Sequence, residues 1–472
     1  MRLFLKLFVS GIFAILFLRN PVYAGLPILA ESAALIDEAT GALLYSNNPH
    51  EIMYPAGLTK ILTAILVIEY LDLNEIIVIG NEVLTTPGGS IIAGHLIGEH
   101  ITVANLLRTL IIGNANDSGI VLSLAVARAQ RGVYDIPFEG AQTVFANLMN
   151  ARALEIGALY TNFVNPNGLH HDNHVSTAYD LALISREFLS YPFLRELAAQ
   201  SYWTGNGLDG ADPAAIEALD APVRTVDYNI INSNALVSDG DFNYSYATGI
   251  RSGSTPQSGD NVVASATKGE VSLVAVALNS PDPGRWLDVI NLFEHGFLNY
   301  DYRTLLEEGQ LLRTVSVANV VIGAETSLDI LVEEGFRLLL NEAEVARATI
   351  ELVLDEAFKP SEEFLAETES ENEEKSELIA PIFEGDAIGR VVISLDGRVL
   401  FSTNALAARD IEARSLDSDM DFYLALIIER AFSPEAVPYW IAGGGALIGI
   451  IGIILAIKER RKRKKRSWTM LR

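Results

Sequence analysis

The segment from Leu58 to Leu71 is apolar on almost every side and contains neither glycine nor proline. Its isoleucines Ile61, Ile65 and Ile68 recur at helical spacing, and leucines lie beside them. A helix that is apolar all round is stable only when other elements cover it, so we expect this helix to be mostly buried inside a domain. With 472 residues, 50% of them hydrophobic, the chain is long enough for two folded domains with such a core.

The pattern around this helix predicts an α/β domain over residues 25–300. Two short strands surround a turn at Thr40-Gly41, and a second hairpin turns at Lys268-Gly269. Because strand patterns stand at both ends of a helical middle, we expect one sheet assembled from segments that are distant in the sequence. Helical patterns cover residues 103–131, 139–157, 177–200 and 283–300.

Residues 301–418 have a different residue pattern, with short β-rich segments such as "LLRTVSVANVV" and "GRVVISLDGRVLFST". These segments predict a smaller β domain. A glutamate-rich stretch, 361–377, interrupts it and is interpreted as a solvated loop rather than a metal site. Residues 419–436 are expected to form a linker helix leading to the C-terminal apolar run.

Both ends of the chain carry membrane-related signals. Residues 1–24 combine early basic residues, an apolar run and a small-residue site ending at Ala24, which is typical of a signal peptide, with an uncleaved anchor as the alternative. Residues 437–457 are uncharged and precede the basic tail 458–472, which indicates a transmembrane helix with a cytoplasmic tail. We therefore expect a single-pass protein on the extracytoplasmic face of a bacterial plasma membrane.

The formal net charge is −26 at pH 7, although both ends of the chain are net positive. An acidic region between them disfavours nucleic acids as partners. The chain has no cysteine, which excludes disulfide bonds and thiol chemistry.

Several segments resemble one enzyme family, most of them between Ala33 and Tyr300 and one in the β-rich region that follows. They are "TTPGGS", "TNFVNPNGLHHDNHVSTAYDLALI", "ATGIRSGSTPQSGDNVVASAT" and, near the C-terminus, "PIFEGDAIGRVVISLDGRVL". The chain is similar to the serine-type D-alanyl-D-alanine carboxypeptidases, low-molecular-mass penicillin-binding proteins that trim peptidoglycan stem peptides. This resemblance implies a transpeptidase domain like those of penicillin-binding proteins and β-lactamases, with an antiparallel sheet flanked by helices, a small C-terminal β domain and no cofactor.

The first family motif is Ser-x-x-Lys at the start of a helix, where the lysine deprotonates the nucleophilic serine one turn away. This sequence has Gly57-Leu58-Thr59-Lys60 at that place. The base position is kept as Lys60, and the nucleophile position is lost at Gly57. Since the family also uses the backbone N–H at this position as one oxyanion donor, that half of the oxyanion hole is expected to remain.

The second motif is Ser-x-Asn, whose serine relays a proton and whose asparagine holds the substrate backbone. The matching residues are Asn114-Ala115-Asn116. Asn116 keeps the substrate-holding amide. Asn114 replaces the relay hydroxyl with an amide, which cannot relay a proton at neutral pH.

The third motif is Lys-Thr-Gly on an edge strand, which presents a cation and a hydroxyl to the terminal carboxylate of the substrate. Arg251-Ser252-Gly253 stands here, followed by Ser254 at the position of the second oxyanion N–H. An arginine can grip a carboxylate with two parallel hydrogen bonds, so the third motif remains compatible with binding. Together the three motifs favour a pseudoenzyme that binds stem peptides ending in D-Ala-D-Ala without covalent chemistry, or that regulates an active carboxypeptidase or another cell-wall synthesis protein.

Three alternatives stay open at this point. Catalysis could use a relocated nucleophile, for which Thr59, Ser118, Ser252 and Ser254 are the candidates, and the protein would then be an active carboxypeptidase. His170, His171, Asp172 and His174 lie close enough in sequence to suggest zinc, although the family loop they resemble shapes the site without metal. The fold could also serve only as a membrane-tethered interaction module, which stem-peptide binding would distinguish.

Overall fold

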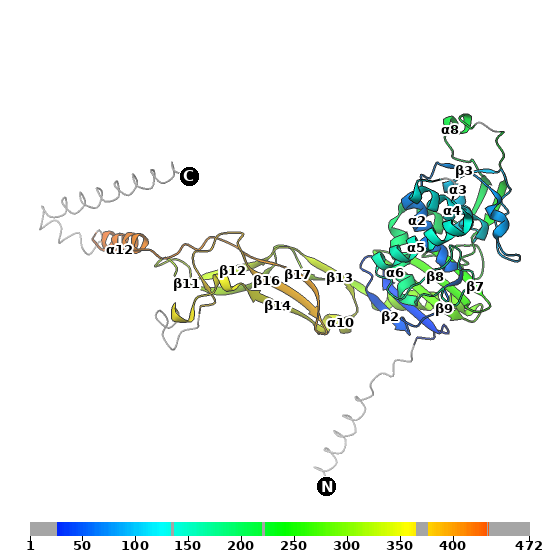
Figure 1. The fold of residues 1–472 in the computed structure, drawn as a ribbon. Helices are drawn as coiled ribbons and strands as arrows, with labels where there is room; N and C mark the ends of the chain where they lie inside the picture. Colours follow the sequence, from blue (N-terminus) through cyan, green and yellow to red (C-terminus); the bar gives the residue numbers. More distant parts are fainter. Residues whose placement is uncertain (1–25, 134–135, 220–221, 365–375, 432, 434–472) are drawn as a thin grey trace, which may run out of the picture. The chain divides into compact units, whose positions relative to one another are not determined.

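The computed structural model describes residues 26–133, 136–219, 222–364, 376–431 and 433. The chain divides into two units, Met1–Tyr302 and Arg303–Arg472 (Figure 1). The predicted signal peptide, transmembrane helix and basic tail lie outside the described residues. Among the helices that are described, none combines the length and the apolar character needed to cross a membrane.

A five-stranded antiparallel sheet forms the centre of the first unit, in the order β2-β1-β9-β8-β7. β1 pairs along its whole length with β9, which confirms the prediction of a sheet assembled from distant segments. The two predicted hairpins are present, and Gly41 and Gly269 take left-handed φ angles of 76° and 63° in their turns. The strands are β1 (Ser32–Asp37), β2 (Leu43–Asn47), β7 (Ala247–Thr255), β8 (Gly259–Lys268) and β9 (Val271–Ser280).

Helices cover both faces of this sheet because successive strand residues point to opposite sides. Val274 and Val276 of β9 join the large core around α2 (Lys60–Tyr70). Leu273, on the other face, lies against Gly296 of α9 (Gly284–Asn299), where a Cβ atom would come within 2.5 Å of the leucine side chain. The first eight residues of α2 are all buried, which confirms the predicted buried helix.

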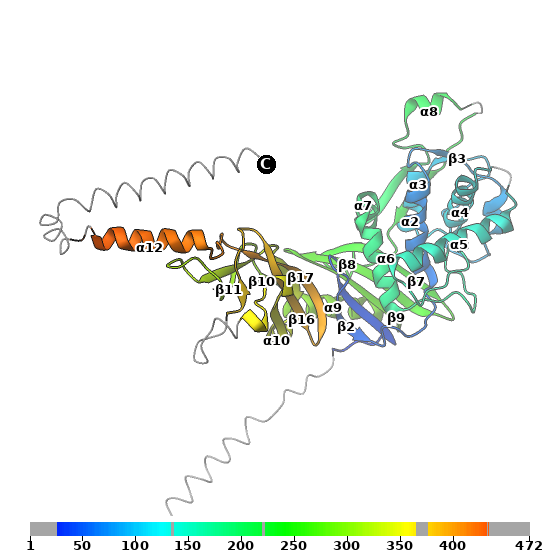
Figure 2. The same ribbon diagram turned by 60° about the vertical axis from the view of Figure 1, so that its left-hand side comes forward.

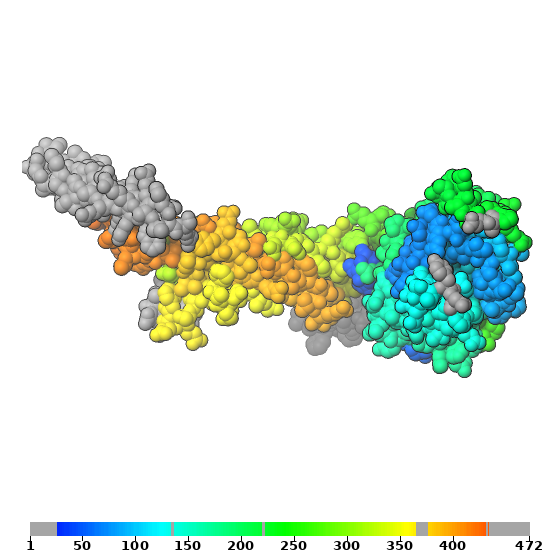
Figure 3. Space-filling model, turned by 45° about the horizontal axis from the view of Figure 1, so that its top comes forward, coloured from blue at the N-terminus to red at the C-terminus, as the bar shows by residue number. Residues whose placement is uncertain are grey.

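The remaining helices of the first unit are η1 (Ala56–Thr59), η2 (Asn81–Thr85), α3 (Val103–Ile111), α4 (Asn116–Arg131), α5 (Phe138–Ile156), α6 (Ala178–Ser190), α7 (Pro192–Ala199) and α8 (Pro213–Glu217). Of these, η1, α3, α4, α5 and α6 contact α2, whereas α7 packs against β7 (Figure 2). Figure 3 shows the blue and cyan segments over one face of the unit. Two short strand pairs complete the unit: β3 (Ile76–Val78) with β4 (His100–Thr102), and β5 (Tyr202–Asn206) with β6 (Asp227–Ile231).

The helical pattern over residues 103–131 is not one helix. α3 ends before Ile112 and α4 begins at Asn116, and Asn114 lies between them with a left-handed φ of 58°. Asparagine is among the few residues besides glycine that adopt this conformation readily, because its short polar side chain bonds locally. The break places Asn114 and Asn116 at the start of a new helix rather than in the middle of a long one.

The second unit contains a six-stranded sheet with the order β14-β16-β17-β12-β11-β15 and a separate β10–β13 pair. Its core is independent of the first, with Ile330, Val391 and Ile393 among the fully buried side chains. Most of the glutamate-rich stretch lies outside the described residues. The elements are β10 (Asp301–Leu306), β11 (Leu311–Ala318), β12 (Ser327–Val332), β13 (Phe336–Leu340), α10 (Glu342–Arg347), β14 (Ala348–Leu354), η3 (Glu356–Phe358), β15 (Leu378–Ile379), β16 (Ala387–Leu395), β17 (Arg398–Ala407) and α12 (Leu416–Ala431).

Candidate functional site

The site is built where η1 packs against the edge strand β7. Gly57 in η1 and Gly253 in β7 touch through their backbones: a Cβ atom on Gly253 would lie 2.5 Å from the nitrogen and 2.8 Å from the Cα of Gly57. Such distances exclude any side chain at residue 253, so the close approach of strand and helix requires glycine there. The third predicted motif is therefore held directly against the first.

Gly57 itself has room for a small side chain. A Cβ atom at this position would lie 3.1 Å from Oδ1 of Asn114, 3.4 Å from the Cα of Gly253 and 3.6 Å from the carbonyl oxygen of Ser252. Only the contact with Asn114 is tight. The missing nucleophile is thus a property of the sequence and is not imposed by crowding.

Lys60 lies one turn after Gly57 and is 2% exposed. Its Nζ donates to Oδ1 of Asn114 at 3.0 Å and to the carbonyl oxygen of Asn167 at 3.1 Å. Burial lowers the pKa of this amine well below its ordinary value, the positive charge of Arg251 lowers it further, and Asp117 partly offsets both effects. These two hydrogen bonds hold the amine between the second motif and the loop that contains Asn167.

Arg251 points into the protein interior and is 0% exposed. One terminal nitrogen donates to the carbonyl oxygens of Leu110 and Ile111 at the end of α3, at 2.9 and 3.3 Å, and the other donates to Oδ1 of Asn114. Burial lowers the pKa of the guanidinium to about 9. This placement corrects the expectation that Arg251 grips a carboxylate: the free carbonyls of the helix end and the asparagine amide take its terminal donors instead.

Asn114 connects the three motif positions through a single atom. Its Oδ1 accepts hydrogen bonds from both Lys60 and Arg251 and lies beside the empty side-chain position of Gly57. An amide oxygen carries no proton, so it can accept hydrogen bonds from both side chains but cannot pass a proton between them. The arrangement holds two buried basic side chains and contains no relay.

The other predicted binding residues differ in their exposure and in whether their polar side-chain atoms already have hydrogen-bond partners. Ser252 is 6% exposed, and its hydroxyl donates to the carbonyl oxygen of Ser233 at 3.0 Å. This corrects the expectation that it presents a free hydroxyl proton to a ligand. Ser254 is exposed. Asn116 is 8% exposed, and its Oδ1 has no hydrogen-bond partner among the described residues.

Thr59, a candidate for a relocated nucleophile, is fully buried and already engaged. Its hydroxyl donates to the carbonyl oxygen of Ala56 at 2.9 Å and lies 2.8 Å from Nε2 of His174. His174 accepts the backbone N–H of Val164 at Nδ1, so its remaining proton is on Nε2 and points at Thr59. Burial lowers the pKa of His174 to about 3, which keeps the ring neutral.

Both ring nitrogens of His174 are engaged by Thr59 and Val164, not by other members of the predicted histidine cluster. His170 instead lies 3.4 Å from the carboxylate of Asp172. Among the described residues no group of three or more histidines and carboxylates is arranged to hold a metal ion. The contacts of His174 fit a structural role in fixing the start of α2.

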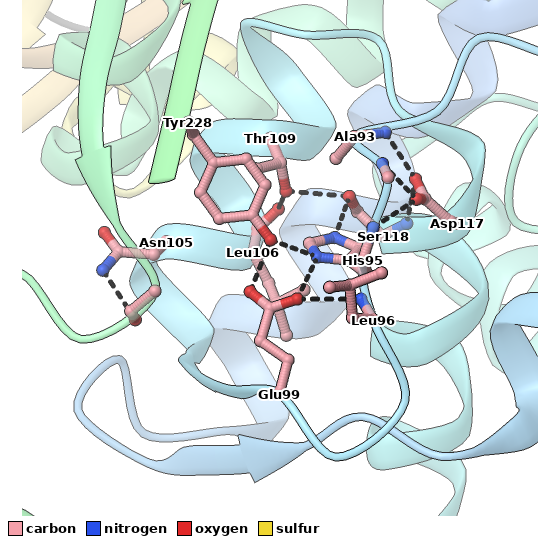
Figure 4. A network of polar contacts seen from close by, with 12 residues as sticks. Ala93, His95, Leu96, Glu99, Asn105, Leu106, Thr109, Asp117, Ser118 and Tyr228 are labelled. Carbon is pink, nitrogen blue, oxygen red and sulfur yellow. Dashed lines mark hydrogen bonds and ion pairs between the residues drawn. The ribbon is translucent and has the colours of Figure 1, made fainter. Parts of the chain in front are cut away.

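Ser118 belongs to a buried polar network that sequence reasoning missed (Figure 4). Its Oγ lies 2.9 Å from Nε2 of His95 and 2.8 Å from the hydroxyl of Thr109, and Nδ1 of His95 lies 2.7 Å from the hydroxyl of Tyr228. Tyr228 donates to Glu99, and burial together with this carboxylate raises the pKa of the tyrosine.

This order of serine, histidine and acid is superficially that of a hydrolase triad. The hydroxyl of Ser118, however, is fully buried and shared with Thr109, so a substrate carbonyl has no access to it. Only His95 and Glu99 show a local spacing; Tyr228 joins them through the fold. No sequence signal could have identified the network.

Asp117, next to Ser118, holds the loop that precedes this network. Its carboxylate accepts the backbone N–H groups of Ala93 at 2.9 Å, Gly94 at 2.9 Å and His95 at 3.2 Å. The carbonyl oxygen of Ile91 in the same loop accepts the backbone N–H of Asn116. The loop and the start of α4 are therefore fixed as one body.

Two family models match this chain. The model described as D-alanyl-D-alanine carboxypeptidase matches residues 21–282, and the model described as penicillin-binding protein 5, C-terminal domain, matches residues 300–413. The carboxypeptidase DacF of Bacillus subtilis is 26% identical over 399 residues, which is 81% of this chain and 86% of that protein. The carboxypeptidase DacA of Haemophilus influenzae is 25% identical over 420 residues, 86% of this chain and 91% of the relative.

Solved structures agree with this picture at the level of the fold. Penicillin-binding protein 5 from Haemophilus influenzae has a TM-score of 0.57 and 23% identity, covering 82% of this chain and 98% of that structure. The carboxypeptidase DacD from Francisella tularensis has a TM-score of 0.59 and 21% identity, covering 83% of this chain and 95% of the structure. Both units of the fold are thus shared with these proteins.

Proposed function

This chain belongs to the D-alanyl-D-alanine carboxypeptidase family, and from that premise we propose that it recognises peptidoglycan stem peptides without forming an acyl-enzyme. Serine-type acyl transfer needs a nucleophile, a base and a proton path. Gly57 supplies no nucleophile. The observation that carries the proposal is the amide oxygen of Asn114, which binds Lys60 and Arg251 together at the place where a relay hydroxyl would be needed.

Binding without chemistry is supported by Asn116. A buried acceptor that lacks a partner is costly, and a ligand N–H that pairs with it recovers that cost. Oδ1 of Asn116 is such an acceptor within the described part of the chain. In the proposed complex it accepts an N–H of the peptide, the backbone amides of Gly57 and Ser254 face the penultimate carbonyl, and Arg251 acts on the terminal carboxylate only through its charge.

The proposed location is the extracytoplasmic face of the plasma membrane, with the chain anchored by residues 437–457. Support comes from the sequence: the leader-like segment 1–24, and an uncharged run followed directly by a basic tail. In this position the protein would hold stem peptides close to an active carboxypeptidase or another cell-wall synthesis protein and so regulate access to them.

Calorimetry with a pentapeptide ending in D-Ala-D-Ala, beside the same peptide ending in L-Ala-L-Ala, tests the binding. We expect binding of the D-form only, weakened about tenfold or more by Asn116→Leu, since a buried hydrogen bond is worth about 1–3 kcal/mol when one partner is lost. Asn299→Leu, on the exposed surface of α9, is the matched control and should bind normally. Equal binding of both peptides, or of neither, would leave the protein as an interaction module without this ligand.

Intact mass after prolonged incubation with a penicillin tests the absence of acylation. The expected mass is unmodified, while an active family member incubated in parallel gains one adduct. An adduct on this chain that maps to a serine or threonine would establish a relocated nucleophile and an active carboxypeptidase.

A further inference from the structure

One face of α12 carries four large apolar side chains that the described residues leave uncovered. Leu416 is 86% exposed, Met420 55%, Tyr423 53% and Ile427 57%. Single exposed apolar residues are normal on a protein surface, but four in register on one short helix mark an interaction surface.

Their spacing identifies the kind of surface. The steps from Leu416 to Met420, Tyr423 and Ile427 alternate between four residues and three, which is the a and d pattern of a coiled coil. These four residues form a seam along the helix, and Leu426, which is 38% exposed, lies beside it. The helix meets its own domain elsewhere, through Phe422, whose ring lies where a Cβ atom of Gly323 would be, at 2.9 Å.

The charges of α12 argue against lipid as the occupant of this seam. The helix contains Asp417, Asp419, Asp421 and Glu429 against the single basic residue Arg430. Helices that lie in a membrane surface are rich in lysine and arginine on their polar face, and anionic lipid headgroups repel an acidic helix. A protein partner fits the seam better.

A second copy of this chain is the partner that the seam fits. In a parallel pair each a or d residue meets its own counterpart, so the pattern is complementary to itself. A seam of two heptads is too short to hold two soluble chains firmly together. Shortly after α12 the uncharged run 437–457 begins, and two copies anchored by it would be parallel and locally concentrated.

We propose that α12 pairs in parallel with α12 of a second copy, through Leu416, Met420, Tyr423 and Ile427, and so joins two anchored chains directly above the membrane. This rests on the membrane anchoring included in the proposed function and does not depend on stem-peptide binding. The pairing would present two candidate sites from one dimer and raise the avidity for cross-linked or neighbouring stem peptides.

The absence of cysteine from the sequence allows a direct test. Met420→Cys and Tyr423→Cys are introduced separately into the full-length chain, reconstituted in lipid vesicles and oxidised mildly. We expect about tenfold more disulfide-linked dimer than for Ala425→Cys, which is exposed but lies on the opposite side of the helix. Adding Ile427→Asp to the Tyr423→Cys chain should return its dimer to the Ala425→Cys level, because a charge in the seam opposes pairing.

Vesicle flotation on the same samples reports membrane retention separately. The pairing is overturned if the protein stays on the vesicles and the Met420→Cys, Tyr423→Cys and Ala425→Cys variants all form the same amount of disulfide-linked dimer. An environment-sensitive dye attached to the thiol of the Tyr423→Cys variant reports contact with lipid. If its emission shifts to the blue only when lipid is present, and no cross-linked dimer forms, the seam contacts the membrane instead of a second copy. Loss of retention overturns the inference together with the anchoring on which it rests, while calorimetry with the stem peptide still reports on binding independently.

Discussion

At the residue scale, the empty position at Gly57 and the amide of Asn114 act together. Restoring only the nucleophile adds a side chain whose Cβ has a tight 3.1 Å contact with Oδ1 of Asn114, and it leaves the proton path closed. Gly57→Ser is therefore expected to fold and to remain unacylated by penicillin. The double variant Gly57→Ser with Asn114→Ser supplies both the nucleophile and a relay hydroxyl, and it should gain a penicillin adduct.

Intact mass after incubation with penicillin distinguishes the two variants. The control is Asn114→Ser alone, which has the relay hydroxyl but no nucleophile and should stay unmodified. A full adduct on Gly57→Ser alone would show that Asn114 does not block the chemistry. If the double variant gains no adduct, the remaining block to acylation would be assigned to Arg251, which occupies the position of the lysine in the family's third motif.

Lys60 should make the stability of the first unit depend on pH. Its pKa in the folded chain is lowered from the ordinary value of 10.5, mainly by burial. Between the lowered value and 10.5 the unfolded chain binds a proton that the folded chain does not, so the free energy of unfolding rises with pH across this window. The penalty of the buried amine is fully present below the folded pKa and vanishes above 10.5.

Lys60→Met removes this part of the pH dependence and should stabilise the first unit at the acidic end of the window, by about 1–3 kcal/mol. Urea unfolding followed through the fluorescence of Trp203 and Trp286, which both lie in the first unit, measures it. Lys359→Met, at a surface ion pair in the second unit, should leave the curve unchanged. An unaltered slope in Lys60→Met would show that the amine is not responsible.

The sequence could predict those features of the site that depend on local spacing, but not those that depend on contacts made by the fold. The spacing of Gly57 and Lys60 assigned them correctly to the entrance of one helix, because one helical turn is a local property. The direction of Arg251 was not predictable, since its acceptors at the end of α3 are brought to it by the fold. The positive charge kept in the third motif gave no indication that the guanidinium is turned inward.

At the element scale, the start of α4 depends on Asp117. Its carboxylate holds three consecutive backbone N–H groups of the loop from Ala93 to His95. Removing this charged acceptor leaves the three loop donors and the backbone N–H of Ser118 without it, so Asp117→Ala should destabilise the first unit by about 2–4 kcal/mol. Hydrogen exchange should show those three amides losing protection before the strands of the sheet do.

Asp212→Ala provides the matched control for this prediction. Asp212 caps the five-residue helix α8 by accepting one backbone N–H at the exposed surface. Its loss should cost about 1 kcal/mol or less. If the two variants were equally stable, the loop would be held by something other than the carboxylate of Asp117.

The elements themselves were predicted well where the pattern was local and strong. The buried helix after Gly57 and the hairpins at Gly41 and Gly269 follow from apolar periodicity and turn residues. The break between α3 and α4 was missed although Gly113 and Asn114 are turn-forming residues, because apolar residues at helical spacing flank them on both sides. The left-handed conformation of Asn114 ends α3 there, and a pattern of side chains does not reveal a backbone angle.

At the scale of the whole molecule, the two units have separate hydrophobic cores. A core substitution should therefore act on one unfolding transition and not on the other. Leu62→Ala in the first core and Ile330→Ala in the second each remove a fully buried side chain, at a cost of about 2–5 kcal/mol. Calorimetry should show two transitions, with Leu62→Ala lowering only the one that tryptophan fluorescence also follows.

The Ile330→Ala variant is the internal control for the Leu62→Ala variant, and the reverse holds as well. A single transition that both variants shift equally would contradict the independence of the cores. The chain divides between Tyr302 and Arg303. The change in composition after Tyr300 is visible in the sequence because the β-rich second unit has a different residue pattern.

The contact between Gly57 and Gly253 involves backbone atoms only, and this affects how proteins of this fold are detected with labelled penicillins. Radioactive or fluorescent penicillins reveal their targets on a gel because an ester bond survives denaturation, and that bond needs a side-chain oxygen at the helix entrance. A chain with glycine there would leave no band, however abundant it is. Surveys that rely on such labels would then underestimate how many copies of this fold a cell contains.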